Sequence, residues 1–291
     1  FEANFDNGMQ ETIATIERAS GDDKIPFSVF KITGVGRFAL LEKVNAKQTL
    51  TEKEKKEYER VYNRINTICK KAHSLNIPIF IDAEESWIQD TIDELATAMM
   101  HKYNKEHAIV YNTLQMYRWD RLAYLKQCYA DAENYKYFLG LKLVRGAYME
   151  KERARAEKLG YASPIQKNKA STDKDYDIAV FFCVENIDRI AFCAGTHNED
   201  SSAKLTKLLA EKGIDKNDKR VYFSQLLGMS DHISYNLAFA KYNVAKYVPY
   251  GPVKEVIPYL IRRAEENTSI TGQTSRELAL IMKEKARRSV Q

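Results

Sequence analysis

Residues 189–211 read RIAFCAGTHNEDSSAKLTKLLAE, and this stretch decides the fold class. Its first six residues are mostly apolar and β-prone, which is typical of a buried strand. A glycine and the polar residues Thr196, His197 and Asn198 follow, and apolar residues then recur at helical spacing as far as Leu209. The stretch therefore predicts a strand, a polar loop and a helix, in that order.

The same alternation continues along the whole chain. Alternating strands and helices predict a parallel sheet with right-handed crossovers, so the expected fold class is α/β, a (βα)8 TIM-type barrel. An open doubly wound sheet is the alternative, because alternation alone does not distinguish the two. The expected strands are residues 27–33, 78–82, 109–113, 139–144, 189–194, 221–225 and 245–248. The expected helices begin after Thr51, where Glu54 completes a capping box, and continue at residues 91–103, from 118, 149–159, 175–185, 200–211, 231–240, 252–267 and from 275.

These seven strands are fewer than the eight that close a barrel, so we expect the first strand upstream of Phe1. No linker rich in proline, glycine or serine and no low-complexity segment divides the chain. The expected organisation is therefore a single domain over residues 1–291.

The composition argues against several classes of function. The net charge of +5 is small, and most basic residues stand beside acidic ones, so nucleic-acid binding is not expected. The four cysteines lie far apart and the histidines lack metal-ligand spacing, so we expect reduced thiols and no metal site. No apolar run reaches the roughly 18 residues of a membrane span. The one local basic cluster, residues 283–288, is expected on a solvated final helix, with contact to an anionic membrane as the alternative.

A glycine-rich segment near the start resembles a nucleotide site. Residues 34–39 spell GVGRFA, which matches the phosphate-binding fingerprint of dinucleotide-binding folds. That fingerprint needs a following strand that ends in an acidic residue about 20 positions later. The next expected strand ends only at Asp82, so we expect the glycines to let a loop turn at the barrel rim.

Polar side chains stand at nearly every expected strand end, where the functional groups of such barrels collect. Lys31 and Lys142 lie within apolar runs, where a lysine is costly unless it is paired or faces a ligand. We consider a structural pair with a carboxylate such as Asp82, a ligand contact, and a Schiff base with a carbonyl substrate. Asn198 or Asp200 is expected to cap the following helix. The other strand-end candidates are Asn112, Gln115, Arg145, Thr196, His197, Gln225 and Tyr247.

The segment YLIRRAEEN, residues 259–267, places four polar side chains on one helix face. Tyr259, Arg262, Arg263 and Glu266 stand at i, i+3, i+4 and i+7. Two adjacent arginines on that face need anions, and the planar guanidinium offers paired hydrogen bonds to a carboxylate or phosphate. We therefore expect the pair to grip a small carboxylate substrate. A surface Arg262–Glu266 pair, worth a few tenths of a kcal/mol, is the alternative.

Taken together, these motifs resemble the proline dehydrogenase family. YVPYGP at residues 247–252, followed by YLIRRAEEN, is similar to the family's C-terminal signature. The run at 146–161 is closer to the monofunctional, mitochondrial-type enzymes than to the long bifunctional ones. Other similar stretches follow in family order: FKIT at 30–33, FIDAEE at 80–85, YNTLQ at 111–115, LKLVRGAY at 141–148, THNED at 196–200 and QLLGM at 225–229.

The resemblance implies a distorted (βα)8 barrel that binds FAD at the carboxyl ends of the strands, with the last barrel helix over the site. It implies that Arg262 and Arg263 clamp the carboxylate of L-proline, with Lys31 and Glu266 completing that polar cluster. The other implied substrate residues are Tyr247, Tyr259 and Leu226 against the proline ring, and Asp82, Ala147 and Tyr148 at the loop that closes the pocket. The implied flavin contacts are Asp82, Asn112, Gln115, Lys142, Arg145, Gly146, Thr196, His197, Asn198, Gln225 and Glu266. Many members carry arginine at Lys142 and some carry glutamine at Asn112, which leaves the tuning of the flavin open.

The implied reaction is the oxidation of L-proline to Δ1-pyrroline-5-carboxylate, the first step of proline catabolism. A hydride passes from C5 to flavin N5, and the electrons then pass to a membrane quinone. The resemblance implies peripheral membrane contact, at the inner membrane from the cytoplasm in a bacterium or from the mitochondrial matrix in a eukaryote. Tyr247 is typical of members that prefer proline, and a hydroxyproline dehydrogenase is the nearest alternative. A Schiff-base aldolase or lyase barrel that uses Lys31 or Lys142 is the alternative from another class of enzyme.

Overall fold

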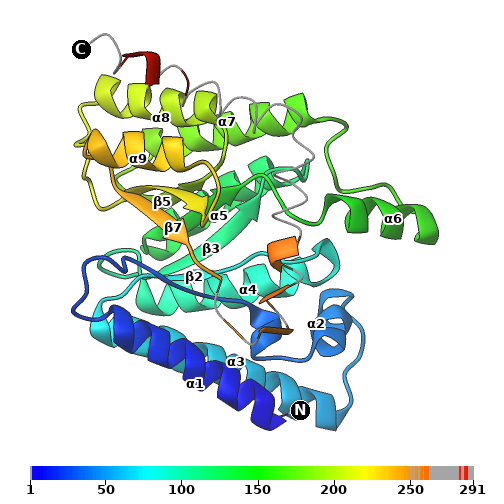
Figure 1. The fold of residues 1–291 in the computed structure, drawn as a ribbon. Helices are drawn as coiled ribbons and strands as arrows, with labels where there is room; N and C mark the ends of the chain where they lie inside the picture. The colour runs from blue at the N-terminus through cyan, green and yellow to red at the C-terminus, as the bar shows by residue number, and fades with distance from the viewer. Residues whose placement is uncertain are drawn as a thin grey trace.

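The computed structural model describes residues 2–249, 251, 253, 254, 256, 257, 259–261, 282 and 285–287. Seven parallel strands form one sheet in which each strand is hydrogen-bonded to its neighbours in sequence. The sheet curls into a half-barrel with helices on its outer side (Figure 1). The strands are β1 Ser28–Phe30, β2 Ile79–Ile81, β3 Val110–Gln115, β4 Leu139–Val144, β5 Ile190–Gly195, β6 Val221–Leu226 and β7 Val244–Tyr247.

The strand order confirms the α/β class and the parallel sheet. A doubly wound sheet reverses its strand order part-way, and the consecutive order β1 to β7 excludes that alternative. The closed eight-stranded barrel is not confirmed, because among the described residues β1 and β7 are the two ends of the sheet. The first strand is shorter than the expected 27–33, because the chain turns at Lys31 into a 3-10 helix, Ile32–Gly34.

The helices agree with most of the expected ranges. Thr51 and Glu54 form the expected capping box, and Asn198 caps the helix that follows it by accepting from the Ser201 amide. The expected helices at 252–267 and from 275 fall where most residues lie outside those described. The helices are α1 Glu2–Ala19, α2 Phe38–Asn45, α3 Glu52–Leu75, α4 Ser86–Tyr103, α5 Arg121–Tyr135, α6 Met149–Leu159, α7 Lys169–Glu185, α8 Glu199–Glu211 and α9 Asp231–Phe239.

The first helix, α1, is not predicted from the sequence, because its residues are mostly polar and include Gly8. It packs along α3, and its residue Ile16 is fully buried. Arg64 of α3 is 5% exposed and holds Glu2 and Asp6 of α1 at 2.5 and 2.7 Å. Tertiary packing and these ion pairs therefore supply the stability that helix propensity alone does not.

The glycine-rich segment at 34–39 leads into α2 where a loop is expected. A Cβ atom at Gly36 would lie 2.9 Å from a methyl group of Val61, so glycine allows the close approach to α3. The next strand is β2, after the long helix α3, so the chain does not form the βαβ unit that a dinucleotide fingerprint requires. In this segment Gly36 serves packing against α3.

Alternate residues of the strands face two apolar regions. One set packs against the helices, and the other, including Phe80, Tyr111 and Cys193, lines the concave side. There the Phe27 ring lies 4.3 Å from the Phe80 ring and 4.7 Å from the Tyr222 ring, between centroids. These rings fill the interior below the carboxyl ends of the strands, so polar residues that continue the same alternation collect above them.

Two further expectations concern thiols and membrane spans. The four cysteines are buried, and each is a free thiol. Within the described part of the chain, none of the helices combines the length and the apolar character needed to cross a membrane.

Candidate active site at the carboxyl ends of the strands

Asp82 follows β2 and connects three strands across the concave side. Its carboxylate accepts a hydrogen bond of 3.0 Å from the Tyr247 hydroxyl of β7 and forms an ion pair with Lys142 of β4. The side chains of Asp82 and Lys142 are only 12% and 9% exposed. We call these three residues the Asp82 cluster. Because β2 and β7 lie far apart in the strand order, the cluster joins the two sides of the half-barrel.

Aromatic rings surround the Lys142 ammonium within this cluster. Nζ of Lys142 lies 5.2 Å from the centre of the Phe80 ring and 5.5 Å from that of Tyr247, which is within cation–π range. The negative charge of Asp82, and then burial, raise the pKa of Tyr247 far above its ordinary value. The Tyr247 hydroxyl therefore stays protonated and keeps donating to Asp82.

Apolar surface adjoins Tyr247 on two sides. Leu226 is its register partner on β6, so the two residues lie side by side in the sheet. The Tyr259 ring lies 6.3 Å from the Tyr247 ring, between centroids, with the planes tilted by 33°. The structure thus brings together the three residues expected against a substrate ring.

Lys31 lies directly after β1, and its hydrogen-bond partner is a tyrosine, whereas a carboxylate such as Asp82 is the structural partner considered for it. Its Nζ donates to the Tyr148 hydroxyl at 3.0 Å. The nearby buried carboxyl of Glu84 accepts from the amide and the hydroxyl of Thr33, at 3.2 and 2.6 Å. Desolvation lowers the pKa of Lys31, but the adjacent Tyr148 hydroxyl and the electrostatic effect of Glu84 and Asp82 raise that pKa more, to above its ordinary range. Lys31 is therefore a cation at the edge of the site.

The loop after β4 depends on a glycine. Gly146 has φ +138, and a Cβ atom there would lie 2.5 Å from the Tyr117 ring. The amide of the next residue, Ala147, donates to Gln115 at 3.3 Å, and Gln115 donates to the carbonyl of Glu84 at 2.8 Å. The Gln115 side chain thereby ties the loop after β4 to the loop after β2.

Arg145 forms a second cationic centre between β4 and β5. It donates to Asp173 and to the Thr196 hydroxyl, both at 2.6 Å, and to Ser201 at 3.0 Å. Its guanidinium lies 4.4 Å from the centre of the Tyr176 ring. These contacts fix the guanidinium beside the polar loop that follows β5.

The remaining candidates on β5 and β6 hold this polar loop in place. A ring nitrogen of His197 lies 3.0 Å from the Ser230 hydroxyl, and Asn198 caps α8. Gln225 is buried and donates to the carbonyl of Thr196 at 3.1 Å. His197 is therefore partly exposed and held by Ser230, whereas the buried Gln225 supports the loop from below.

The side chain of Asn112 does not point into the site. Its amide donates at 2.8 Å to Asp93 of α4, which also holds Arg121 at 2.6 Å. This buried network lies between the sheet and the helices, on the convex side of β3. The side chain of Asn112 thus faces α4 and not the concave side of the sheet. The other expected residues Arg262, Arg263 and Glu266 lie outside the described residues.

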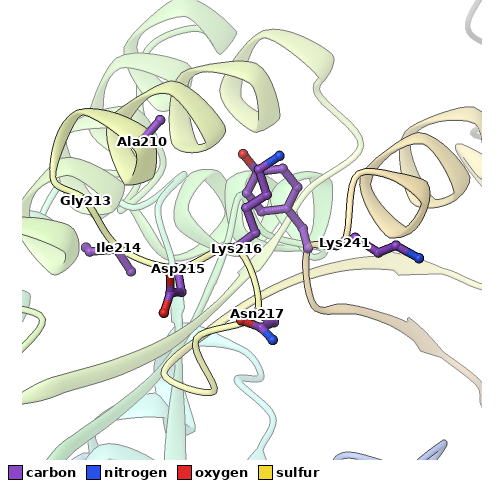
Figure 2. Close-up of a pocket in the computed structure, with 8 residues that line it drawn as sticks. Ala210, Gly213, Ile214, Asp215, Lys216, Asn217 and Lys241 are labelled. Carbon is purple, nitrogen blue, oxygen red and sulfur yellow. The ribbon is translucent and has the colours of Figure 1, made fainter.

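A separate pocket of about 500 Å³ lies where α8 leads into β6 and α9 leads into β7 (Figure 2). This is the amino end of those strands, opposite the site. Lys216, Lys241 and Asp215 supply its charged groups. Because none of the expected site residues lines it, we do not assign the chemistry to this pocket.

The sequence matches the protein-family model described as proline dehydrogenase over residues 2–276. The chain belongs to the proline dehydrogenase family. The match confirms the resemblance inferred from the motifs.

This proline dehydrogenase family chain is also similar in sequence to individual proteins. It is 39% identical to mitochondrial proline dehydrogenase 1 of Homo sapiens over 241 residues, which cover 82% of this chain and 40% of that protein. It is 34% identical over 289 residues to the carbapenem antibiotics biosynthesis protein CarD of Pectobacterium carotovorum, covering 99% of this chain and 74% of CarD. The chain therefore spans less than half of the human relative.

A solved structure has a fold similar to that of this proline dehydrogenase family chain. Proline utilization A (PutA) from Bdellovibrio bacteriovorus superposes with a TM-score of 0.80, at 20% identity, over 93% of this chain and 29% of that chain. At this identity the similarity concerns the fold alone.

The motifs do not single out two further residues of this proline dehydrogenase family chain, one within the site and one beside its loops. Phe80 stands two positions before Asp82 on the same strand face, and that spacing is a usable signal for a ring beside Lys142. Glu152 is fully buried, although it stands within the highly charged helix α6. Glu152 is of the same residue type as neighbouring acidic residues of α6 that are exposed, so the sequence carries no signal for its burial.

Proposed function

We propose that this protein is an oxidoreductase that oxidises L-proline to Δ1-pyrroline-5-carboxylate, with FAD as hydride acceptor and a quinone as final acceptor. The observation that carries the proposal is the convergence of the family's motif residues at one end of the half-barrel. Asp82, Lys142 and Tyr247 meet there, beside the Lys31–Tyr148 pair.

The residues present fit FAD in their chemistry. FAD offers phosphate oxygens and an acceptor-rich ring edge, which call for cations and hydrogen-bond donors. The site provides the cations Lys142 and Arg145, the Thr196 hydroxyl 2.6 Å from Arg145, and the ring of His197 in the same loop as Thr196. We assign FAD binding to these residues, with Gly146 and Asn198, and we assign to Gln115, Gln225 and Asp82 the task of holding their loops. Bound FAD supplies a hydride acceptor, which no side chain can supply.

The substrate end of the site is proposed around Lys31. A proline carboxylate needs cations, and we assign this task to Lys31, with Arg262, Arg263 and Glu266 completing the cluster. The apolar ring of proline would lie against Tyr247 and its neighbours Leu226 and Tyr259. Ala147 and Tyr148 would close the pocket, because the amide of Ala147 is tied through Gln115 to the loop after β2.

The task of the protein groups is to orient the substrate and to exclude water. Proline with a neutral amine loses the hydride on C5, and its nitrogen lone pair forms the C=N bond. The proton that remains on this nitrogen is then released to solvent, which gives the neutral imine. No protein nucleophile takes part. A charged Lys31, and a Lys142 engaged with Asp82, are poor nucleophiles, which argues against a Schiff-base aldolase or lyase.

The finer partners are proposed from the family. We propose a membrane quinone as electron acceptor and peripheral contact with the inner membrane, on the cytoplasmic side in a bacterium. Eukaryotic relatives are named mitochondrial, and there the matrix side of the inner membrane is proposed. Hydroxyproline is the alternative substrate, and Tyr247 is the residue proposed to disfavour it.

The proposal predicts a yellow protein. We expect the purified protein to show the visible absorption of an oxidised flavin, and we expect L-proline under anaerobic conditions to bleach it. D-proline is the matched control, because it presents the same groups with its carboxylate misplaced. A colourless protein that borohydride traps covalently with a carbonyl substrate would instead support the Schiff-base alternative and overturn the proposal.

A further inference from the structure

Helix α6 is attached to the loop after β2 by charged side chains. Lys151 forms an ion pair with Glu85, and Glu152 accepts from both the amide and the hydroxyl of Ser86, each at 2.6 Å. One turn further on, Arg155 lies 2.6 Å from Glu42 of α2. Three successive contacts thus hold one face of α6 against the segments that begin α4 and form α2.

Glu152 is the unusual member of this set, because its exposure is 0%. A buried carboxylate is costly unless it is paired or hydrogen-bonded. Within the described residues, no lysine or arginine forms an ion pair with Glu152. Its charge is instead met by the two donors of Ser86.

The two Ser86 donors belong to the start of α4. Glu85 is the N-cap residue of α4, but its side chain makes no capping hydrogen bond. The carboxylate of Glu152 therefore caps α4 from another helix, where the positive end of the helix dipole favours an anion. The geometry makes α4 and α6 depend on each other.

The two loops that meet at this contact carry the site. The loop that ends at Ser86 begins with Asp82, which holds Lys142 and Tyr247. On the other side, α6 follows directly on Tyr148, which holds Lys31.

We infer that Glu152 is a positioning residue, which fixes the loop of Asp82 against the loop of Tyr148 by capping α4. Glu152 itself touches neither the Asp82 cluster nor Lys31, and acts through Ser86. The inference rests on the proposed function, because the two loops matter for catalysis only if the site is where proline is oxidised.

The test is Glu152→Gln, which keeps the shape of the side chain and removes its charge. We expect amide hydrogen exchange in residues 82–90 to become faster by about tenfold or more, as loss of a hydrogen bond to a charged acceptor implies. We expect kcat per flavin-bound enzyme to fall by about tenfold or more, because small displacements of catalytic groups are that costly. The matched control is Glu150→Gln, an exposed acidic residue of the same helix, which should change neither quantity.

The outcomes separate positioning from mere stability. A lower melting temperature with unchanged kcat per flavin-bound enzyme would overturn the inference, as would unchanged exchange in residues 82–90. If Glu152→Gln does not fold, Ser86→Ala is measured in the same way, since it keeps the amide and removes only the hydroxyl donor. If the unaltered protein does not oxidise proline, the proposed function fails, while the exchange measurement still decides whether Glu152 holds the loop.

Discussion

At the scale of single residues, the Asp82 carboxylate has two separate tasks. One oxygen is paired with Lys142 and the other accepts from Tyr247, so neither partner can move without exposing a buried charge. Breaking a buried pair of this kind costs about 3–5 kcal/mol, which makes a rigid arrangement. The Tyr247 ring is held by this hydrogen bond, and its centre lies 5.5 Å from Nζ of Lys142 and 6.3 Å from the centre of the Tyr259 ring.

Tyr247 is therefore predicted to set the choice between proline and hydroxyproline. Tyr247→Ser removes the ring and makes room for a hydroxyl, so we expect the ratio of kcat/KM for hydroxyproline to that for proline to rise about tenfold. Steady-state kinetics with both substrates measure this ratio.

The control is Tyr247→Phe, which keeps the ring and removes only the hydrogen bond to Asp82. It should lower activity on both substrates and leave the ratio unchanged. An equal shift in both variants would assign selectivity to the hydrogen bond and not to the ring.

Single residues also show which side-chain partners could be predicted from the sequence. Lys142 is predicted to be costly without a partner, and its pair with Asp82 fits that expectation because strand alternation turns both side chains to the concave side. The pairing of Lys31 with Tyr148 is not predicted, because it depends on the path of the loop after β4. Alternation along β3 turns the side chain of Asn112 to the convex side. This orientation is not predicted, because naming the residues at the strand ends does not separate inward-facing from outward-facing positions.

At the scale of elements, α1 shows what polar composition conceals. Met9, Ile13 and Ile16 recur at helical spacing, and these residues pack against the core. The signal is weak because Gly8 and several charged residues interrupt it. Ion pairs with Arg64 on α3 also stabilise α1. They join segments roughly 60 residues apart in the sequence, so no local sequence pattern predicts them.

The position of Gly8 gives a prediction for this element. Alanine is the better helix former by about 1 kcal/mol, so Gly8→Ala would stabilise an isolated α1. In the folded protein a Cβ atom at Gly8 would lie 2.4 Å from the carbonyl oxygen of Gly34. We expect the cost of overpacking to exceed the gain in helix propensity, so the free energy of unfolding, measured with urea, should fall by about 1 kcal/mol or more.

Gly34→Ala is the matched control on the other side of the same contact. A Cβ atom there meets nothing within 4 Å, and Gly34 is not among the positive-φ glycines. Its effect should stay within about 0.5 kcal/mol. A stabilised Gly8→Ala variant would show that α1 does not press against residues 32–34.

At the scale of the whole molecule, the order of the strands follows from the sequence, whereas the closure of the barrel does not. Alternation of strands with helices predicts neighbouring parallel strands, and the sheet has that order. Curvature is set by the residues that fill the concave side, here the rings of Phe27, Phe80 and Tyr222. Their contacts join β6 to the segment before β1, across the sheet, and depend on the twist of every strand between them.

The buried charge network between α4 and α5 predicts how the whole molecule responds to acid. Asp120 precedes α5 and accepts from Arg118 at 2.7 Å and from Arg121 at 2.6 Å. Burial by itself would raise the pKa of Asp120, but these hydrogen bonds and charges outweigh it and lower that pKa to about 2. A lowered pKa contributes stability that is complete above the ordinary value of 3.8 and is lost as the pH falls towards 2. Allowing for partial exposure, we expect this contribution to be about 1–2 kcal/mol.

The measurement compares the urea midpoint of the unaltered protein with that of Asp120→Asn between pH 6 and pH 2. The difference in stability should be constant from pH 6 to about 5, shrink below pH 4, and fall to a small fraction near pH 2, because the protonated form of Asp120 no longer attracts the two arginines. Asp188→Asn is the control, since Asp188 is fully exposed and lies 3.7 Å from Arg220. A difference that persists unchanged at pH 2 would mean that Asp120 stabilises the start of α5 by hydrogen bonding alone, without a contribution from its charge.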